Sequence, residues 1–416
     1  MLPKLIKIKQ DVPAPQLKNI SAEVFNQIKK LNLEKSKVGG KSIGITVGSR
    51  GIHAIDDITR AIVSSIKEMG GVPIIIPAMG SHGGASERGQ EEVLASLGIT
   101  ETSVMAPIKF CASAVKIGET SNGIPVYCSE EAVKLDGLVI ANRIKSHTDF
   151  TGDIESGLCK MMTIGLGNPK GADTAHYYAV NYGYAEMIRE SAEIILEKLP
   201  VIFALGIVEN WKNQTMKIEA ILPENIIEKE RELLKYYKKN SLKLPFKEAD
   251  ILIVGEMGKN ISGAGMDTKV IGRIRILGQK EPNYPKINNI VVLDITEESH
   301  GNATGIGLAD YTTMKVFKEM DINATTINGL TSMSPDQIRI PCILENDLQA
   351  IEAAIRTLGP AKENNFSMAY IKNTASLEEM AVTENIFEQI NGRVEALEGP
   401  KDLVFNSKGK LKSPLE

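Results

Sequence analysis

The sequence predicts an α/β protein made of two α/β domains with largely parallel sheets and an active site in the cleft between them. Three observations lead to this prediction. Short runs that are apolar at every position, as expected of strands covered on both faces, alternate with amphipathic helical windows. The chain has 416 residues, which suits two domains at roughly 100–200 residues each. The alternation stops in a heavily charged helical stretch at residues 224–243 and then restarts.

The strands and helices of the first half follow one another in regular order. The expected strands are 42–47, 72–76 and 138–141, and the expected helices are 55–66 and 91–97. In the first helix, apolar residues recur three or four positions apart, and Asp56 and Asp57 lie in the first turn, where negative charge is favourable. Continuous apolar strands separated by helices predict a parallel sheet with both faces covered.

The same alternation returns in the second half. The expected elements are strands 251–254, 290–293 and 324–328, and a helix over 347–358 that is closed by Gly359 and Pro360. We therefore place the domain boundary near residue 245. This gives an N-terminal domain of residues 1–245 and a C-terminal α/β domain of residues 246–416.

The composition excludes several classes of function. The formal net charge is −4 and charges of both signs are mixed, so no basic stripe indicates nucleic acid or an anionic membrane as a partner. The four cysteines are scattered, which indicates a reducing compartment. The N-terminus lacks the apolar core of a signal peptide, and no run of about 18 apolar residues occurs. We expect a cytoplasmic protein.

Four polar residues come soon after predicted strands. Arg50, His82 and His147 follow the three strands of the first half, and Lys259 follows the first strand of the second half. Because ligands bind beyond the carboxyl ends of parallel strands, we expect the first three to gather at one edge of a sheet. Lys259 is expected at the equivalent edge of the second domain. The two histidines are suited to proton transfer near neutral pH.

Known motifs leave alternatives open. HExxH and zinc-type Cys/His spacings are absent, so an ordinary structural or hydrolytic zinc site is not expected. A pyridine-nucleotide oxidoreductase remains an alternative, with His82 or His147 transferring the proton, although no GxGxxG turn with a following acidic residue occurs. A non-catalytic metal- or ligand-binding protein on the same scaffold is a second alternative. His53 and His300 are expected to be structural.

A set of residues in the first half resembles a known family. In chain order the set is Arg50, His82 within Gly80-Ser-His82, His147, Lys160 within residues 155–162, and His176. Their order and intervals resemble the N-terminal domain of nickel-pincer lactate racemases and related hydroxyacid racemases and epimerases. The clear match covers residues 40–180, and residues 142–150 and 164–171 are its most specific part. Beyond it, the resemblance is carried by the domain layout and by Lys259.

The resemblance implies a cofactor and a way of holding it. The cofactor is a nickel-pincer nucleotide, a pyridinium mononucleotide with thioamide and thiocarboxylate groups that bind Ni(II). Lys160 would tether it through the thioamide, and His176 would be the remaining nickel ligand. Soft sulfur with one imidazole in a planar set suits Ni(II). Cofactor-synthesis proteins are then implied as partners.

The resemblance also implies a reaction. The chain would be an isomerase, a racemase or epimerase of a small 2-hydroxy acid, in which the C2 hydride moves to the cofactor and returns. His82 and His147 would be the acid/base pair, while Arg50 and Lys259 would bind the substrate. The N-terminal domain would then hold the cofactor and the acid/base residues, with the C-terminal domain on the substrate side.

Three departures from lactate racemase surround this set. The segment between His147 and Lys160 is longer than in lactate racemase, so the covalent tether at Lys160 stays open. Val47 replaces an acidic residue, and Trp211, the single tryptophan, does not fall where an aromatic substrate wall is expected. These departures bear on the identity of the 2-hydroxy acid.

Overall fold

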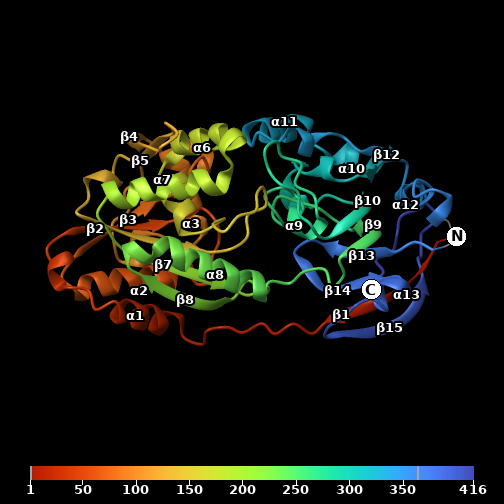
Figure 1. The fold of residues 1–416 in the computed structure, drawn as a ribbon, viewed down its shortest axis with the longest axis horizontal. Helices are drawn as coiled ribbons and strands as arrows, with labels where there is room; N and C mark the ends of the chain where they lie inside the picture. Colours follow the sequence, from red (N-terminus) through yellow and green to blue (C-terminus); the bar gives the residue numbers. More distant parts are fainter. Residues whose placement is uncertain (1, 363–364) are drawn as a thin grey trace. The chain divides into compact units, whose positions relative to one another are not determined.

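The computed structural model describes residues 2–362 and 365–416. Contacts divide the chain into two compact units, each with its own α/β sheet (Figure 1). The N-terminal unit comprises Ala14–His147 and Thr151–Ser241, and the C-terminal unit comprises the chain up to Pro13, Thr148–Phe150 and Leu242–Glu416. The predicted α/β class with largely parallel sheets is confirmed.

The N-terminal unit is built on a five-stranded sheet of order β3-β2-β6-β7-β8. Its strands are β2 (Ser42–Val47), β3 (Val72–Pro77), β6 (Gly137–Arg143), β7 (Val201–Glu209) and β8 (Thr215–Ile221). The first four strands in this order are parallel, and β8 runs antiparallel to β7. The three strands predicted for this part of the chain are therefore confirmed. Their apolar residues are buried because helices cover both faces.

The helices of this unit pack on opposite faces of the sheet. They are α1 (Ile20–Lys30), α2 (Ile55–Glu68), α3 (Glu87–Ser96), α4 (Glu101–Val104), α5 (Leu158–Lys160), α6 (Asn168–Tyr182), α7 (Tyr184–Lys198) and α8 (Ile226–Asn240). Successive residues of β7 point to opposite faces. Phe203 and Leu205 lie in the core with α1 and α2, whereas a Cβ at Gly206 would lie 2.8 Å from Leu233 of α8. The hairpin of β4 (Ala114–Glu119) and β5 (Pro125–Ser129) completes the unit.

The strand order places two loops at the point where the chain changes direction across the sheet. From β2 the chain moves to β3 on one side, and it later returns to β6 on the other side of β2. The loops that follow β2 and β6 therefore leave the carboxyl edge in different directions, which is where parallel α/β sheets bind ligands. These loops carry Arg50 and His147.

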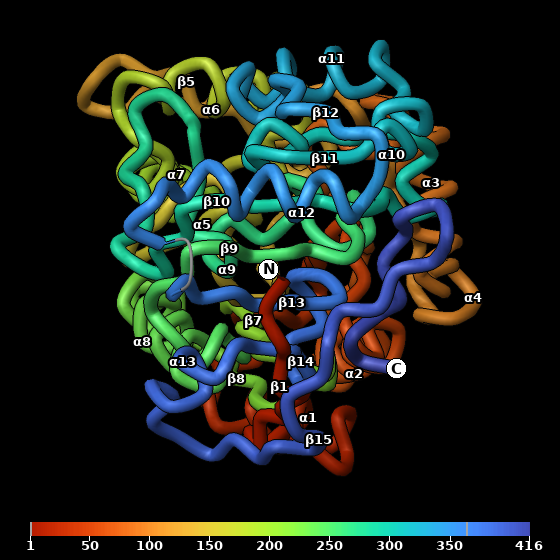
Figure 2. The backbone as a smooth tube through the Cα atoms, turned by 90° about the vertical axis from the view of Figure 1, so that its right-hand side faces the viewer, coloured from red at the N-terminus to blue at the C-terminus, as the bar shows by residue number. Residues whose placement is uncertain are grey.

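The C-terminal unit contains an eight-stranded sheet of order β12-β11-β10-β9-β13-β14-β1-β15. Its strands are β1 (Lys4–Gln10), β9 (Glu248–Val254), β10 (Lys286–Val292), β11 (Tyr311–Thr313), β12 (Cys342–Leu344), β13 (Met368–Asn373), β14 (Ser376–Val382) and β15 (Val394–Asp402). The strands from β12 to β13 are parallel, and the last three are antiparallel. Figure 2 shows β1 beside β14 and β15, and this pairing puts the start of the chain in the C-terminal unit.

The helices of the C-terminal unit include one correction to the sequence prediction. They are α9 (Thr268–Ile271), α10 (Met314–Glu319), α11 (Ile322–Thr331), α12 (Asp347–Arg356) and α13 (Glu384–Phe387). The strand predicted at 324–328 is wrong, because these residues lie inside α11. The Asp321 carboxylate accepts the Ala324 amide hydrogen at 2.8 Å and caps this helix. The cap and the buried face formed by Thr325 and Gly329 outweigh the β preference of the threonines.

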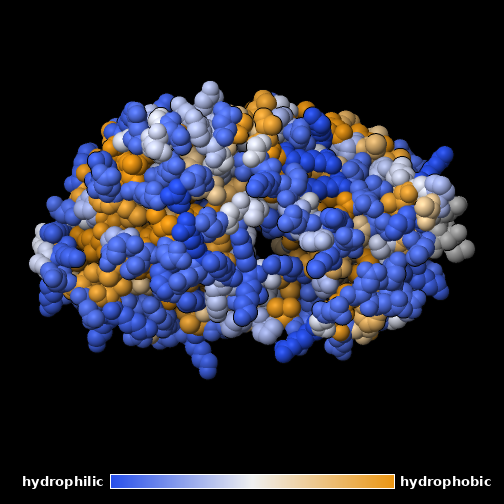
Figure 3. All heavy atoms as spheres, viewed as in Figure 1, coloured by the Kyte–Doolittle hydropathy of each residue, from blue (hydrophilic) through white to orange (hydrophobic). Residues whose placement is uncertain are grey.

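Hydrophilic side chains cover most of the surface seen in Figure 3, as expected when the apolar strands lie inside. None of the helices formed by residues 2–362 and 365–416 combines the length and the apolar character needed to cross a membrane.

Candidate active site

The loop after β6 brings His147 to Lys160. Lys145 and Ser156 exchange two backbone hydrogen bonds, of 2.8 and 3.2 Å, which close the loop at its base. The Nε2 atom of His147 then lies 2.5 Å from the Nζ atom of Lys160, and both side chains are half-buried. The structure therefore joins two of the residues that the sequence singled out.

A buried carboxylate holds the backbone of His147. The side chain of Glu155 is wholly buried, and its Oε2 accepts the His147 amide hydrogen at 2.7 Å. Its Oε1 accepts from the Lys238 ammonium of α8 at 2.6 Å and from the Gly152 amide at 3.2 Å. The ammonium offsets the cost of burying the carboxylate. In the sequence, Glu155 is only the first residue of the stretch 155–162, and nothing in that stretch predicts this contact.

Lys160 lies where a helical run changes its winding. The turn α5 continues into a π-helical turn, Met161–Gly165, before α6 begins. Such wide turns within helices are frequent at functional sites. The loops after β2 and β3 both contact this π-helical turn. A Cβ at Gly48 would lie 3.0 Å from the Met161 Cε, and the Gly80 amide donates to the Gly165 carbonyl at 3.2 Å. Glycine at positions 48 and 80 permits this close approach.

Tyr184 links His176 to His147. Its hydroxyl lies 2.8 Å from Nδ1 of His176, and its ring edge faces that imidazole with centroids 5.8 Å apart. The same ring is stacked on His147 at 6.4 Å, with an angle of 18° between the planes. Tyr184 is buried at the start of α7, whereas His176 lies on α6. The sequence analysis missed Tyr184, because the tyrosine-rich stretch 177–184 also suits an ordinary helix surface.

The loops after β2 and β3 form a second group. His82 is exposed, and its Nδ1 is hydrogen-bonded to the hydroxyl of Ser49 at 2.5 Å. Ser49 is the neighbour of Arg50, so the Arg50 and His82 loops meet through it. The sequence analysis did not single out Ser49, and its position next to Arg50 was the available signal.

Arg50 lies near a second guanidinium group, that of Arg143. Loss of hydration, and to a smaller extent the Arg143 guanidinium, lower the pKa of Arg50 below its ordinary value. The side chain still reaches solvent, and its ordinary value is high enough to keep it charged near neutral pH. Arg143 forms an ion pair with the buried carboxylate of Glu209, which also accepts the His53 amide hydrogen at 2.7 Å. Arg50 therefore suits an anionic ligand.

Lys259 belongs to the C-terminal unit. It lies in the loop after β9, as predicted from the sequence, and its Nζ donates to the Asn328 side-chain oxygen at 2.6 Å and to the Gly263 carbonyl. Its amide donates to the Ser299 hydroxyl at 2.9 Å. His300 lies nearby in the chain, exposed, with a left-handed φ of 46°.

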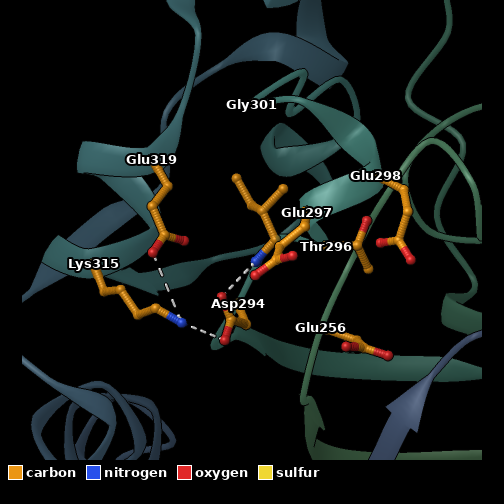
Figure 4. Close-up of a pocket in the computed structure, with 9 residues that line it drawn as sticks. Glu256, Asp294, Thr296, Glu297, Glu298, Gly301, Lys315 and Glu319 are labelled. Atoms are coloured by element: carbon orange, nitrogen blue, oxygen red, sulfur yellow. Dashed lines mark hydrogen bonds and ion pairs between the residues drawn. The ribbon is translucent and has the colours of Figure 1, made fainter.

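The C-terminal unit also has a cavity of about 560 Å³ (Figure 4). Its lining is mostly acidic and comprises Glu256, Asp294, Ile295, Thr296, Glu297, Glu298, Gly301, Lys315 and Glu319. Lys315 forms ion pairs with Asp294 and with Glu319. The six predicted site residues, all described by the structure, lie outside this lining. Among residues 2–362 and 365–416, no group of three or more His, Cys, Asp or Glu side chains is arranged to hold a metal ion.

Comparisons with known proteins agree with this architecture. The model of the lactate racemase N-terminal domain matches residues 5–187. Solved structures similar to the chain include the lactate racemase apoprotein from Thermoanaerobacterium thermosaccharolyticum, with 13% sequence identity and a TM-score of 0.51. That match covers 90% of this chain and 99% of the other, and at this identity it shows a shared fold. No curated protein matches the sequence. Residues 5–187 of this chain are therefore similar to the N-terminal domain of lactate racemase, and the chain shares the fold of the lactate racemase apoprotein.

Proposed function

We propose that this chain is an isomerase, a racemase or epimerase of a small 2-hydroxy acid that works with a nickel-pincer nucleotide. The observation that carries the proposal is the contact of Lys160 with His147, together with the link from His147 through Tyr184 to His176. An amine, an acid/base imidazole and a candidate metal ligand thereby lie in one connected group, in a part of the chain that matches the lactate racemase N-terminal domain.

The residues present fit the cofactor. Lys160 would supply the amine for the covalent tether, and His176 would supply an imidazole ligand for nickel. Metal-bound histidines commonly use their second ring nitrogen for a hydrogen bond to protein, and the Tyr184 hydroxyl provides such a bond at Nδ1. When bound, the group supplies an acceptor that takes the C2 hydride of the substrate and returns it to either face of the 2-keto acid.

His82 and His147 would exchange the hydroxyl proton. One imidazole takes the proton from the substrate hydroxyl as the C2–H bond breaks, and the other returns a proton to the carbonyl oxygen when that bond forms on the opposite face. An imidazole changes charge near neutral pH and can serve in both directions. Ser49 orients His82 through Nδ1, while Glu155 holds the backbone of His147.

Arg50 would bind the substrate carboxylate through charge-assisted hydrogen bonds, with Lys259 of the C-terminal unit as the second substrate-binding residue. The Arg50 side chain reaches solvent, so its guanidinium is accessible to an anionic substrate. The same proposal includes a cytoplasmic location and cofactor-synthesis proteins as partners.

The test is to co-express the chain with cofactor-synthesis proteins and to purify it under native conditions. We expect a nucleotide-sized adduct on Lys160 and one nickel by intact-mass and metal analysis. The loaded protein should then interconvert the stereoisomers of at least one acid in a panel of 2-hydroxy acids. A nickel-free protein without an adduct that binds NAD in a fluorescence titration would instead indicate an oxidoreductase and overturn the proposal.

A further inference from the structure

Helix α8 supplies a buried carboxyl group to the turn that carries Lys160. Glu230 is wholly buried, and its Oε2 accepts the amide hydrogen of Cys159 at 2.7 Å. The first amides of a helix have no partner within the helix, so an acceptor at this end stabilises the turn. Within the described residues, the other oxygen, Oε1, has no hydrogen-bond partner.

The backbone at Gly157 is shaped around this carboxyl. A Cβ atom at Gly157 would lie 2.1 Å from Oε1 of Glu230 and 2.6 Å from its Cδ. Only glycine leaves room for the carboxyl against the start of the turn. The carbonyl of Gly157 accepts from the Asn142 side chain at 2.8 Å, which ties the same point to the end of β6. The start of the turn is therefore held from two sides.

The same helix also holds the other member of the pair. Lys238, two turns further along α8, donates to Glu155 at 2.6 Å, and Glu155 accepts the amide hydrogen of His147 at 2.7 Å. One helix thus reaches the Lys160 side through Glu230 and the His147 side through Glu155. Both carboxyls are buried, and each accepts a hydrogen bond from the backbone amide of its side of the pair.

We propose that Glu230 and Glu155 are positioning residues that set the Lys160 amine against the His147 ring, with α8 as their common support. The inference rests on the proposed function in treating Lys160 and His147 as a working pair. Glu230 fixes the backbone one residue before Lys160, and Glu155 fixes the His147 amide. The distance between Lys160 Nζ and His147 Nε2 is then set by two hydrogen bonds, one from the Cys159 amide to Glu230 and one from the His147 amide to Glu155. Displacements of about 1 Å at such a pair can change rates by about two orders of magnitude.

The first test needs no cofactor. The full chain is labelled with limiting acetic anhydride, and the rate at Lys160 is measured by peptide mass spectrometry against exposed Lys170 of α6 as the internal reference. In Glu230→Gln and Glu155→Gln, the amine is released from His147, so we expect labelling of Lys160 to become several-fold faster relative to Lys170. Glu228→Gln on the same helix is the matched control, because Glu228 is exposed and pairs with Arg231 at the surface.

The labelling results distinguish a specific positioning of the Lys160 amine from a general destabilisation of the protein. An unchanged Lys160 rate in both variants would overturn the proposal, as would the same change in Glu228→Gln. If Glu230→Gln does not fold by circular dichroism, the labelling of Glu155→Gln decides alone. A uniform rise at all lysines would show a structural role only.

The second test uses the cofactor-loaded protein. Both variants should lower kcat by about 10- to 100-fold with a small change in KM, since the pair is displaced while the substrate carboxylate contact is kept. The double variant should lose less than the product of the two single effects, because both act on one distance. If the cofactor-loaded wild-type protein shows no turnover, the proposed function is refuted. The labelling experiment would still decide whether the carboxyls of Glu230 and Glu155 position Lys160.

Discussion

The Nζ atom of Lys160 lies 2.5 Å from Nε2 of His147, which makes the proposed tether a direct neighbour of the proposed base. An ammonium group only donates, so a charged Lys160 requires Nε2 as acceptor and a neutral imidazole with its proton on Nδ1. Conversion of the amine to a thioamide nitrogen removes that charge. Loading of the cofactor would therefore also change the surroundings of His147.

Replacement of Lys160 tests the tether. In Lys160→Ala, co-expressed with cofactor-synthesis proteins, we expect the intact mass to equal that of the bare chain, because the amine that forms the covalent bond is absent. Lys170→Ala is the matched control, since Lys170 is an exposed lysine further along the same helical run. An adduct of unchanged mass in the Lys160 variant would place the tether elsewhere.

Replacement of the two loop histidines tests the proton transfer. His82→Ala and His147→Ala should each reduce kcat by about 10²–10⁴-fold, the usual contribution of a positioned acid or base. His300→Asn serves as control, because His300 is exposed in the C-terminal unit and asparagine tolerates its left-handed φ. Near-normal turnover by either alanine variant would refute the two-base scheme.

His176 and Tyr184 are tested by metal content. His176→Ala should lose nickel after gel filtration, because the imidazole ligand is absent. Tyr184→Phe removes only the hydroxyl on Nδ1, and loss of such an outer partner typically weakens metal affinity by about 10–100-fold. Nickel retention against a chelator series, read by elemental analysis, distinguishes the two variants. Full retention in His176→Ala would exclude this histidine as a ligand.

Arg50 is tested by a change that keeps its charge. In Arg50→Lys we expect KM for the 2-hydroxy acid to rise by about tenfold or more, since an ammonium cannot make the paired hydrogen bonds of a guanidinium. Arg88→Lys on α3 is the control, because Arg88 is exposed and pairs only with Glu92 on the same helix. Steady-state kinetics with an unchanged KM in Arg50→Lys would place the carboxylate at another residue.

Much of the N-terminal unit could be predicted because its strands carry their own signal. The run 138–141 is apolar at every position, and it lies in β6, the central strand of the sheet. The mistaken strand at 324–328 shows the limit of this approach: its threonines favour strands, but the cap from Asp321 lies outside the window. The pairing of β1 with β14 and β15 joins residues at least 370 positions apart, and no local pattern encodes it.

In the candidate site, too, some residues have a local sequence signal, whereas others acquire their role only through contacts made on folding. His147 could be singled out because it follows a predicted strand, and Lys160 because it belongs to a recognisable set of residues. Tyr184 and Glu230 could not, since each has an ordinary place on a helix and acquires its contact only when α7 or α8 packs against the site. A glutamate within the charged stretch 224–243 reads as a solvated residue, whereas Glu230 is wholly buried.

The burial of Glu230 predicts a dependence of stability on pH. Loss of hydration raises the pKa of this carboxyl from 4.5 to about 7, while the hydrogen bond from the Cys159 amide acts in the opposite direction. Between these two values the folded protein binds the proton more tightly than the unfolded chain. The contribution to stability is therefore complete below about pH 4.5 and is lost as pH rises through about 7, to a total of about 3 kcal/mol.

Urea unfolding from pH 4.5 to 8 measures this effect. Trp211 is the single tryptophan and lies in the N-terminal unit with Glu230, so its fluorescence reports the relevant unit. As pH rises, the unfolding free energy of the wild type should fall relative to that of Glu230→Gln, because glutamine has no proton to release. Glu228→Gln should follow the wild-type curve. Parallel curves for wild type and Glu230→Gln would mean that Glu230 does not titrate in this range.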